Sequence, residues 1–213
     1  MNDSPVEVSG EESHALPRKT GRPNFDLIIA ISAIVMSAIS LIVAIENGIS
    51  QHELVAASTW PFLRQILSNG FNEKGDLAIG FSNGGEGPAK IKTFEVFYNG
   101  APVSSGLDLL RKCCGLNAND KEIAKQLPQG FVYSVADNTV LRAGESNPVL
   151  QIHRMASAPD IPSRFSNALQ DIRFRVCYCS ILDECWTTDL KTTSPTSVNT
   201  CRTPAHKFDP NGK

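Results

Sequence analysis

The sequence lacks a strong excess of charge of either sign. Its 20 Lys and Arg residues nearly balance its 22 Asp and Glu residues, and the formal net charge is −2. Proteins that bind nucleic acid usually carry a basic surface that contacts the phosphates. The composition gives no support for such a surface, so we expect no nucleic-acid partner.

The motifs of phosphate-binding loops and of common nucleophiles are also missing. Gly84, Gly85 and Gly87 form a cluster, but it has neither the G-x-G-x-x-G dinucleotide pattern nor the G-K-[ST] of a P-loop. A strand-like run follows it, so we interpret the cluster as a turn in which glycines supply positive φ angles. His153 lies in the run VLQIHR, and no nucleophile elbow accompanies it. We predict no catalytic residue, no cofactor and no metal site.

One stretch of the chain lacks charge, proline and glycine altogether. Residues 27–45, LIIAISAIVMSAISLIVAI, contain nothing more polar than serine. As a helix rising about 1.5 Å per residue, this stretch covers close to the ~30 Å hydrocarbon core of a bilayer. A cleaved signal peptide would be shorter, and a buried core helix would show a polar stripe. The sequence therefore predicts an uncleaved transmembrane helix over residues 25–46, with the lipid bilayer as its partner.

The charges beside this helix differ between its two ends. Arg18, Lys19 and Arg22 stand just before it, whereas Glu46 and Glu53 follow it. The positive-inside rule places the N-terminus in the cytoplasm. We expect a single-pass protein of the cell (inner) membrane with a periplasmic or extracellular C-terminal domain.

Small side chains recur along the predicted helix at intervals of three and four residues. Such a stripe lets two helices approach closely, and serines can form hydrogen bonds across the contact. The alternative is that Ala and Ser are common in spanning helices and that this order has no function. The stripe predicts association with a second copy or with another membrane protein, and its members are Ala30, Ala33, Ser37, Ser40 and Ala44.

The segments that flank the helix and the domain are polar. Residues 1–24 contain three prolines and no aromatic residue, which is typical of a disordered tail. Residues 47–59 continue as a helical linker that we expect to end at Trp60-Pro61, because a residue before proline avoids the helical region. Residues 192–213 are rich in Ser, Thr and Pro without periodicity, and we expect a second disordered tail there.

Residues 60–191 consist of short apolar runs separated by turn signals. The run AKIKTFEVFYNGAPV alternates between apolar and polar residues, and its Asn99-Gly100 predicts a tight hairpin turn. Residues 103–128 favour one or two short helices, and strand-like runs resume after them. We predict an immunoglobulin-like antiparallel β-sandwich with a short helical insertion, and a barrel is the alternative.

Whether two of three neighbouring cysteines can form a disulfide depends on the turn of a predicted late hairpin. Cys177 and Cys179 would share one face of a strand, and Cys185 begins the returning strand. A three-residue turn would place Cys179 opposite Cys185 and allow a disulfide, whereas a two-residue turn would prevent it. Reduced core cysteines and a poorly spaced zinc site are the alternatives. We expect Cys113 and Cys114 not to bridge each other.

Three segments resemble a scattered set of small uncharacterised bacterial membrane proteins, over residues 25 to 190 in outline. The segments are STWPFLRQ after the helix, FSNGGEGPAKIKTFEVFYNG and RVCYCSILDECW. The resemblance implies one N-terminal membrane helix followed by a sandwich domain, and it implies no activity.

The leading functional hypothesis is a membrane-anchored binding or scaffold module that uses loops or an exposed sheet edge. The turn between TVLRAGES and NPVLQIHR and the insertion at 103–128 are the expected binding loops, since rigid scaffolds carry binding sites on loops. The alternative is a membrane-tethered enzyme or thiol-redox protein that uses Cys177, Cys179 and Cys185. A third hypothesis is a small subunit of a larger membrane complex.

Overall fold

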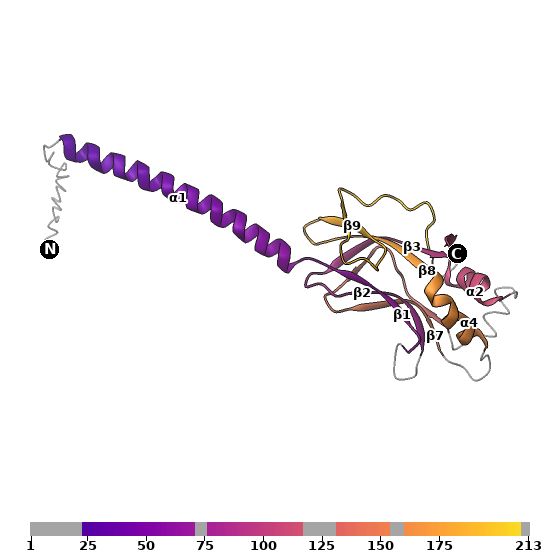
Figure 1. The fold of residues 1–213 in the computed structure, drawn as a ribbon. Helices are drawn as coiled ribbons and strands as arrows, with labels where there is room; N and C mark the ends of the chain where they lie inside the picture. The colour runs from indigo at the N-terminus through magenta and orange to yellow at the C-terminus, as the bar shows by residue number, and fades with distance from the viewer. Residues whose placement is uncertain (1–22, 71–75, 117–130, 154–159, 210–213) are drawn as a thin grey trace, which may run out of the picture. The chain divides into compact units, whose positions relative to one another are not determined.

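The computed structural model describes residues 23–70, 76–116, 131–153 and 160–209 (Figure 1). The chain divides into two units, residues 1–51 and residues 52–213, and each is described by itself. The predicted N-terminal tail lies almost wholly outside the described residues. The same holds for the second helix expected within 103–128.

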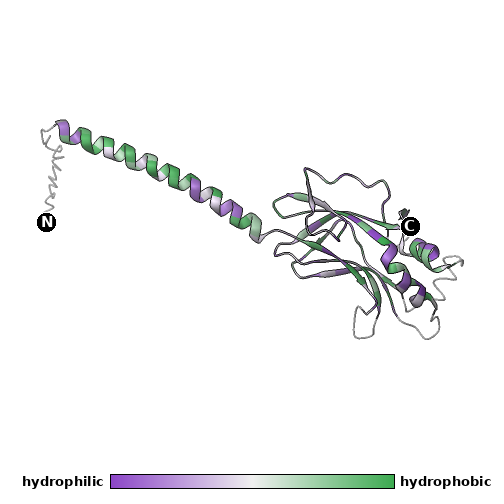
Figure 2. Cartoon of the chain, in the orientation of Figure 1, coloured by the Kyte–Doolittle hydropathy of each residue, from purple (hydrophilic) through white to green (hydrophobic). Residues whose placement is uncertain are grey.

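Helix α1, Pro23–Ser58, is the one helix in the described residues that is long and apolar enough to cross a membrane. Proline suits the first turn of a helix, where its missing N–H would have no partner. The helix ends just before Trp60-Pro61, as predicted, so the linker is helical through Ser58. Apolar residues dominate most of the helix in Figure 2. The large apolar side chains of the predicted span are exposed.

The remaining chain is rich in antiparallel sheet. One sheet has four strands in the order β1-β2-β7-β5. Its hydrogen-bonded pairs are all antiparallel, and β2 and β7 form its centre. The strands are β1 (Leu63–Ser68), β2 (Leu77–Asn83), β5 (Phe131–Tyr133) and β7 (Ser146–Ile152).

The second sheet has six strands in the order β10-β9-β8-β3-β4, and β6 pairs with β3 beside this path. The long strands β3 and β8 pair antiparallel over most of their length. The strands are β3 (Ala89–Tyr98), β4 (Ala101–Val103), β6 (Thr139–Leu141), β8 (Ile172–Cys179), β9 (Cys185–Thr188) and β10 (Thr196–Val198).

The two sheets share one hydrophobic core. Phe81 of β2 lies with its ring centroid 5.2 Å from that of Phe94 of β3, and Phe174 of β8 lies 5.5 Å from Phe94 on the same sheet. Among the described residues, α2 (Gly106–Cys114) contacts β3 and β4, and α4 (Asp160–Ala168) contacts β2. The 3₁₀ turn η1 (Leu169–Asp171) follows α4.

The β3–β4 connection has the predicted hairpin geometry. Asn99 and Gly100 have φ angles of 49° and 78°. A two-residue turn of type I′ needs positive φ at both positions, and its twist matches that of the flanking strands. The register therefore pairs Tyr98 with Ala101, as a two-residue turn requires.

The predicted disordered C-terminal tail is wrong for residues 192–209. This segment contains β10, which pairs with β9, and its Phe208 is 1% exposed. The ring centroid of Phe208 lies 5.9 Å from that of Phe94 in an edge-on contact. Besides the β9–β10 pairing, the segment is held at two isolated positions, Cys201 by a disulfide and Phe208 by burial, and such positions leave no periodic pattern in the sequence.

Candidate functional site

The turn of the β8–β9 hairpin decides how its cysteines meet. Ser180 N donates to Glu184 O at 2.8 Å, which leaves three residues in the turn. Asp183, the last of them, has a φ of 61°, as expected in a three-residue hairpin loop. The resulting register pairs Cys179 with Cys185. This is the turn that the sequence analysis required for a disulfide.

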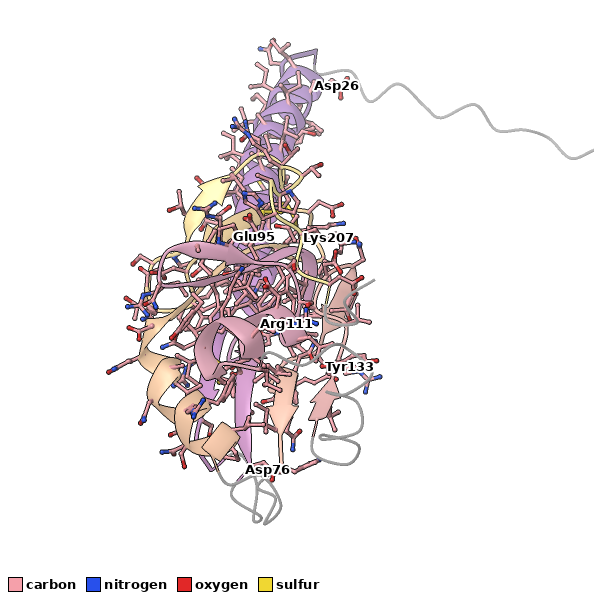
Figure 3. All side chains as sticks on the ribbon, turned by 90° about the vertical axis from the view of Figure 1, so that its right-hand side faces the viewer. Asp26, Asp76, Glu95, Arg111, Tyr133 and Lys207 are labelled. Atoms are coloured by element: carbon pink, nitrogen blue, oxygen red, sulfur yellow. A yellow bond between two sulfur atoms is a disulfide. The ribbon has the colours of Figure 1, made fainter. Side chains whose placement is uncertain are left out.

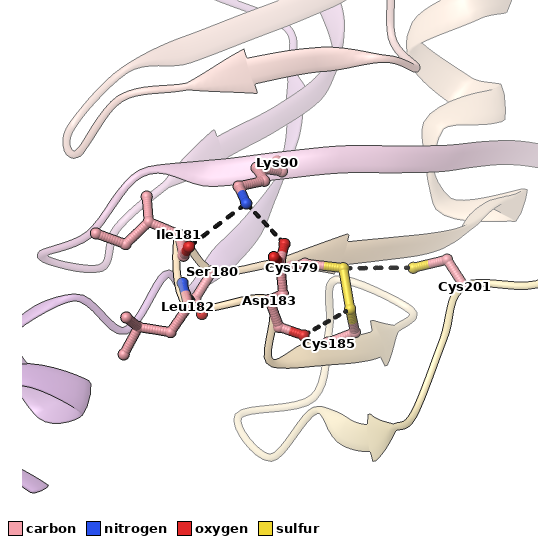
Figure 4. Close-up of polar contacts among 8 residues, drawn as sticks. All are labelled: Lys90, Cys179, Ser180, Ile181, Leu182, Asp183, Cys185 and Cys201. Carbon is pink, nitrogen blue, oxygen red and sulfur yellow. Dashed lines mark hydrogen bonds and ion pairs between the residues drawn. A yellow bond between two sulfur atoms is a disulfide. The ribbon is translucent and has the colours of Figure 1, made fainter. Parts of the chain in front are cut away.

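Cys179 and Cys185 are joined by a disulfide, with their Cα atoms 4.0 Å apart (Figure 4). The sequence allows this pairing only with the three-residue turn and leaves reduced cysteines and a zinc site as alternatives. The remaining cysteine of the strand, Cys177, forms a second disulfide with Cys201 of the C-terminal segment. The sequence analysis missed this pair, because Cys201 lies in a segment that it assigned to a tail. One feature of the sequence points to this pair: Cys177 shares a strand face with Cys179, so a partner for Cys177 would have to lie on that face.

The two disulfides lie against each other. Cys179 Sγ is 4.0 Å from Cys201 Sγ, and the sulfur atoms of Cys179, Cys185 and Cys201 all lie within 4.8 Å of one another. We call these three residues and Cys177 the cysteine cluster. Zinc binds cysteine as the thiolate. In the structure all four sulfur atoms are in disulfides, so a metal could bind here only after reduction.

A cavity of about 550 Å³ opens beside the cysteine cluster. Its lining is polar, and it includes Lys92, Thr93, Asp137, Asn199, Lys207 and the three cysteines Cys179, Cys185 and Cys201. Lys207 Nζ lies 3.1 Å from Asp137 Oδ2. The cavity therefore gives small polar molecules access to the cluster.

Lys90 fixes the tip of the hairpin from the neighbouring strand. Its Nζ donates to Asp183 Oδ1 at 2.7 Å and to the carbonyl of Ile181 at 3.5 Å (Figure 4). The hydrogen bond from Lys90, together with its positive charge, lowers the pKa of Asp183. The carboxylate is exposed, so this pair orients the turn more than it stabilises the fold.

The expectation that Cys113 and Cys114 do not bridge each other is wrong. The structure joins these neighbours at the end of α2 by a disulfide. The last carbonyl groups of a helix have no partner within it, and here Arg164 Nη1 donates to Cys114 O at 3.1 Å. Gly115, with a φ of 69°, then turns the chain away. Both cysteines lie in the last turn of α2, and their Cα atoms are 3.8 Å apart.

His153 has a carboxylate partner. Its Nδ1 lies 2.5 Å from Asp76 Oδ2, and Gln151 Nε2 donates to the same oxygen at 2.9 Å. Asp76 is 1% exposed and lies at the end of the domain away from Lys207 (Figure 3). All six cysteines are in disulfides, so none offers His153 a thiolate. The pairing of a cysteine nucleophile with His153 is therefore absent from this structure.

The glycine cluster lies in the β2–β3 connection, as predicted, but the reason for its glycines differs. Gly84, Gly85 and Gly87 are not among the residues with positive φ. Instead they let two backbones approach: a Cβ on Gly87 would lie 1.8 Å from Thr59 O, and one on Gly85 would lie 2.4 Å from Phe62 N. The cluster therefore serves close packing against residues 59–62.

The small-residue stripe of α1 is exposed along its whole length. Ser40 Oγ donates to Met36 O at 2.8 Å within the helix. Nothing in the structure tests whether Ala30, Ala33, Ser37, Ser40 and Ala44 contact a second helix, and association stays a prediction.

Comparison of the chain with protein-family models, with curated proteins and with solved structures found no match. The resemblance to small bacterial membrane proteins therefore stays a hypothesis.

Proposed function

We propose that this chain is a single-pass membrane protein that holds a binding or scaffold domain outside the cytoplasm. One observation carries the proposal: an exposed apolar helix of spanning length is joined to a domain in which every cysteine is in a disulfide. An exposed apolar helix of this length needs lipid around it. Disulfides persist in oxidising compartments and are rare in the cytosol.

The orientation is part of the proposal. Arg18, Lys19 and Arg22 precede the helix and the acidic Glu46 and Glu53 follow it, which supports a cytoplasmic N-terminus. This orientation exports the cysteine-containing part of the chain, in agreement with its disulfides.

The proposed fold of the domain is an immunoglobulin-like β-sandwich. In that fold, strands A, B, E and D form one sheet, and strands C, F and G form the other. The order β1-β2-β7-β5 corresponds to A-B-E-D when the strands are taken in chain order, and β3-β8-β9 corresponds to C-F-G. The shared core of the two sheets supports this assignment.

The proposed binding surface is the edge formed by β5 and the segment that follows it. In the described residues, β5 pairs with β7 alone, so it is an end strand of its sheet. Another chain can add a strand to the end strand of a sheet. Exposed apolar side chains accompany this edge: Val132 at 48% and Val135 at 56%. The turn at 142–145 is less suited to binding, because Asn83 N donates to Glu145 O and Gly144 N donates to Asn83 O.

Membrane topology is the first test. The full chain should stay in the pellet after alkaline carbonate extraction, and external protease should digest the domain in spheroplasts. As a control, the triple variant Arg18→Glu, Lys19→Glu, Arg22→Glu should show a larger protected fraction, because the orienting charge is reversed. Release by carbonate, or complete protection of the unmodified chain, would refute the proposal.

Binding is the second test. A photo-crosslinking residue at Val132 or Val135 in intact membranes should give a discrete adduct, and one at the exposed Lys191 should not. If no position along the β5 edge gives an adduct, this edge is not the binding surface.

A further inference from the structure

We propose that the cysteine cluster is a thiol–disulfide exchange site in which Cys179 changes its partner from Cys185 to Cys201. Thiol–disulfide exchange requires a thiolate to reach a disulfide sulfur. Cys179 Sγ lies 4.0 Å from Cys201 Sγ, which is itself bonded to Cys177. A thiolate released at Cys179 is therefore already beside its target. This inference goes beyond the proposed anchoring and binding.

The strand register limits the products of exchange. Cys177 pairs with Thr187 and Cys179 with Cys185, so Cys177 and Cys185 are diagonal neighbours. Diagonal Cα atoms lie about 7–8 Å apart, which is too far for a disulfide without backbone movement. The new bond that the structure allows most directly is Cys179–Cys201, with Cys177 and Cys185 left as thiols.

Access comes through the cavity beside the cluster. Cys179, Cys185 and Cys201 line it, whereas Cys177 does not. Lys92 and Lys207 also line it together with Asp137 and Asp183, and Lys207 pairs with Asp137, so the lining carries charges of both signs. Cys179 and Cys185 are only 3% and 8% exposed, so the reductant that reaches their bond is a small dithiol that enters the cavity.

The proposed reaction consumes one dithiol and breaks one disulfide. A thiolate of the dithiol attacks Cys185 Sγ and releases Cys179 as a thiolate. Cys179 then attacks Cys201 Sγ, forms the Cys179–Cys201 bond and displaces Cys177 as a thiolate, which takes up a proton. The second thiolate of the dithiol attacks the dithiol's own sulfur in the mixed disulfide and releases Cys185 as a thiolate, which takes up a proton. The dithiol ends as a disulfide, and its two electrons reside on Cys177 and Cys185.

Partial reduction of the full chain in detergent tests the proposal. The protein is equilibrated in buffers of reduced and oxidised dithiothreitol, quenched with acid, alkylated under denaturing conditions and mapped by peptide mass spectrometry. We expect most chains that have lost one bond of the cluster to carry alkylated Cys177 and Cys185 and an intact Cys179–Cys201 bond. The Cys113–Cys114 pair of α2 is the internal reference and should not mix with the cluster.

Two matched variants separate the roles of the hairpin cysteines. Cys185→Ser leaves Cys179 as a single thiol, and alkylation should divide between Cys179 and Cys177 because the bond to Cys201 migrates. Cys179→Ser leaves Cys185 as the single thiol, within 4.8 Å of Cys201 Sγ, and alkylation should spread to Cys177 clearly less than in Cys185→Ser.

Two outcomes would overturn the proposal. One is a singly reduced wild-type population in which Cys179 and Cys185 are alkylated and Cys177–Cys201 is intact. The other is a Cys179→Ser variant in which alkylation spreads to Cys177 as readily as in Cys185→Ser. The wild-type measurement decides the question even if a variant fails to fold.

Discussion

Asn83, at the end of β2, uses both ends of its amide to hold the entry of the chain into the domain. Its Oδ1 accepts from Phe62 N at 3.2 Å and from Gly85 N at 3.0 Å. Its Nδ2 donates to Gly87 O at 2.8 Å and to Leu141 O at 3.2 Å. The side chain is buried, so each of these groups would lack water if the amide were removed.

Asn83→Ala should therefore lower the free energy of unfolding by about 2–4 kcal/mol, since each buried polar group left without a partner costs about 1–3 kcal/mol. Urea unfolding of the full chain in detergent, followed by tryptophan fluorescence, measures the change. Asn167→Ala, at an exposed position of α4, is the control and should change stability by less than about 0.5 kcal/mol. Equal stability of the two variants would contradict this role of Asn83.

Tyr178 makes the stability of the domain depend on pH in alkali. Burial raises the pKa of its hydroxyl to about 12. The unfolded chain loses this proton near about pH 10, so above that pH the unfolded state binds fewer protons and stability falls as pH rises. At about pH 11 the loss should be about 1 kcal/mol relative to neutral pH.

Tyr178→Phe removes the titrating group and should not show this part of the loss. Urea unfolding of both proteins at about pH 8 and about pH 11 gives the comparison. A loss of the same size in Tyr178→Phe would assign the alkaline effect to other groups.

At the scale of elements, the sequence predicts local turns better than long-range pairings. The end of α1 before Trp60-Pro61, the Asn99-Gly100 turn and the pairing of Cys179 with Cys185 all follow from residues close together in the chain. In each case a proline, a glycine or a turn length restricts the backbone locally.

Features that depend on distant residues could not be predicted in this way. The Cys177–Cys201 bond spans 24 residues, and no periodicity in the intervening segment indicates where Cys201 lies. The glycine cluster shows the same limit. Gly85 and Gly87 are required because the backbone of residues 59–62 passes close to them, and not because their φ angles are positive.

The stripe on α1 gives a prediction at the same scale. Ala33→Leu with Ser37→Leu should abolish association of the helix in a membrane two-hybrid assay, because the larger side chains prevent close approach. Ile34→Leu with Ile42→Leu, outside the stripe, keeps the helix apolar and should associate like the parent. Association of the stripe variant at the parental level would show that the stripe is passive.

At the scale of the whole domain, the core includes side chains from Leu63 of β1 to Phe208 near the C-terminus. Phe208 contacts Phe94, which in turn contacts Phe81 and Phe174. The C-terminal segment is therefore part of the fold and not an appendage to it.

Phe208→Ala should lower the free energy of unfolding by about 3–5 kcal/mol, the usual cost of removing a buried aromatic ring. His206→Ala, two residues earlier and exposed, should leave stability nearly unchanged. Urea unfolding of the full chain measures both. A small effect of Phe208→Ala would mean that the segment contributes little to the core.

The position of Phe208 also has a consequence for synthesis. The Phe94 ring lacks its edge-on contact with Phe208 until the polypeptide has been made through residue 208. Cys201 is likewise synthesised after Cys177, Cys179 and Cys185. The Cys179–Cys185 disulfide can therefore form before the Cys177–Cys201 disulfide. A chaperone or an oxidase that acts on this chain would therefore meet the Phe94 ring without its Phe208 contact and the unpaired Cys177 thiol on the same incomplete domain.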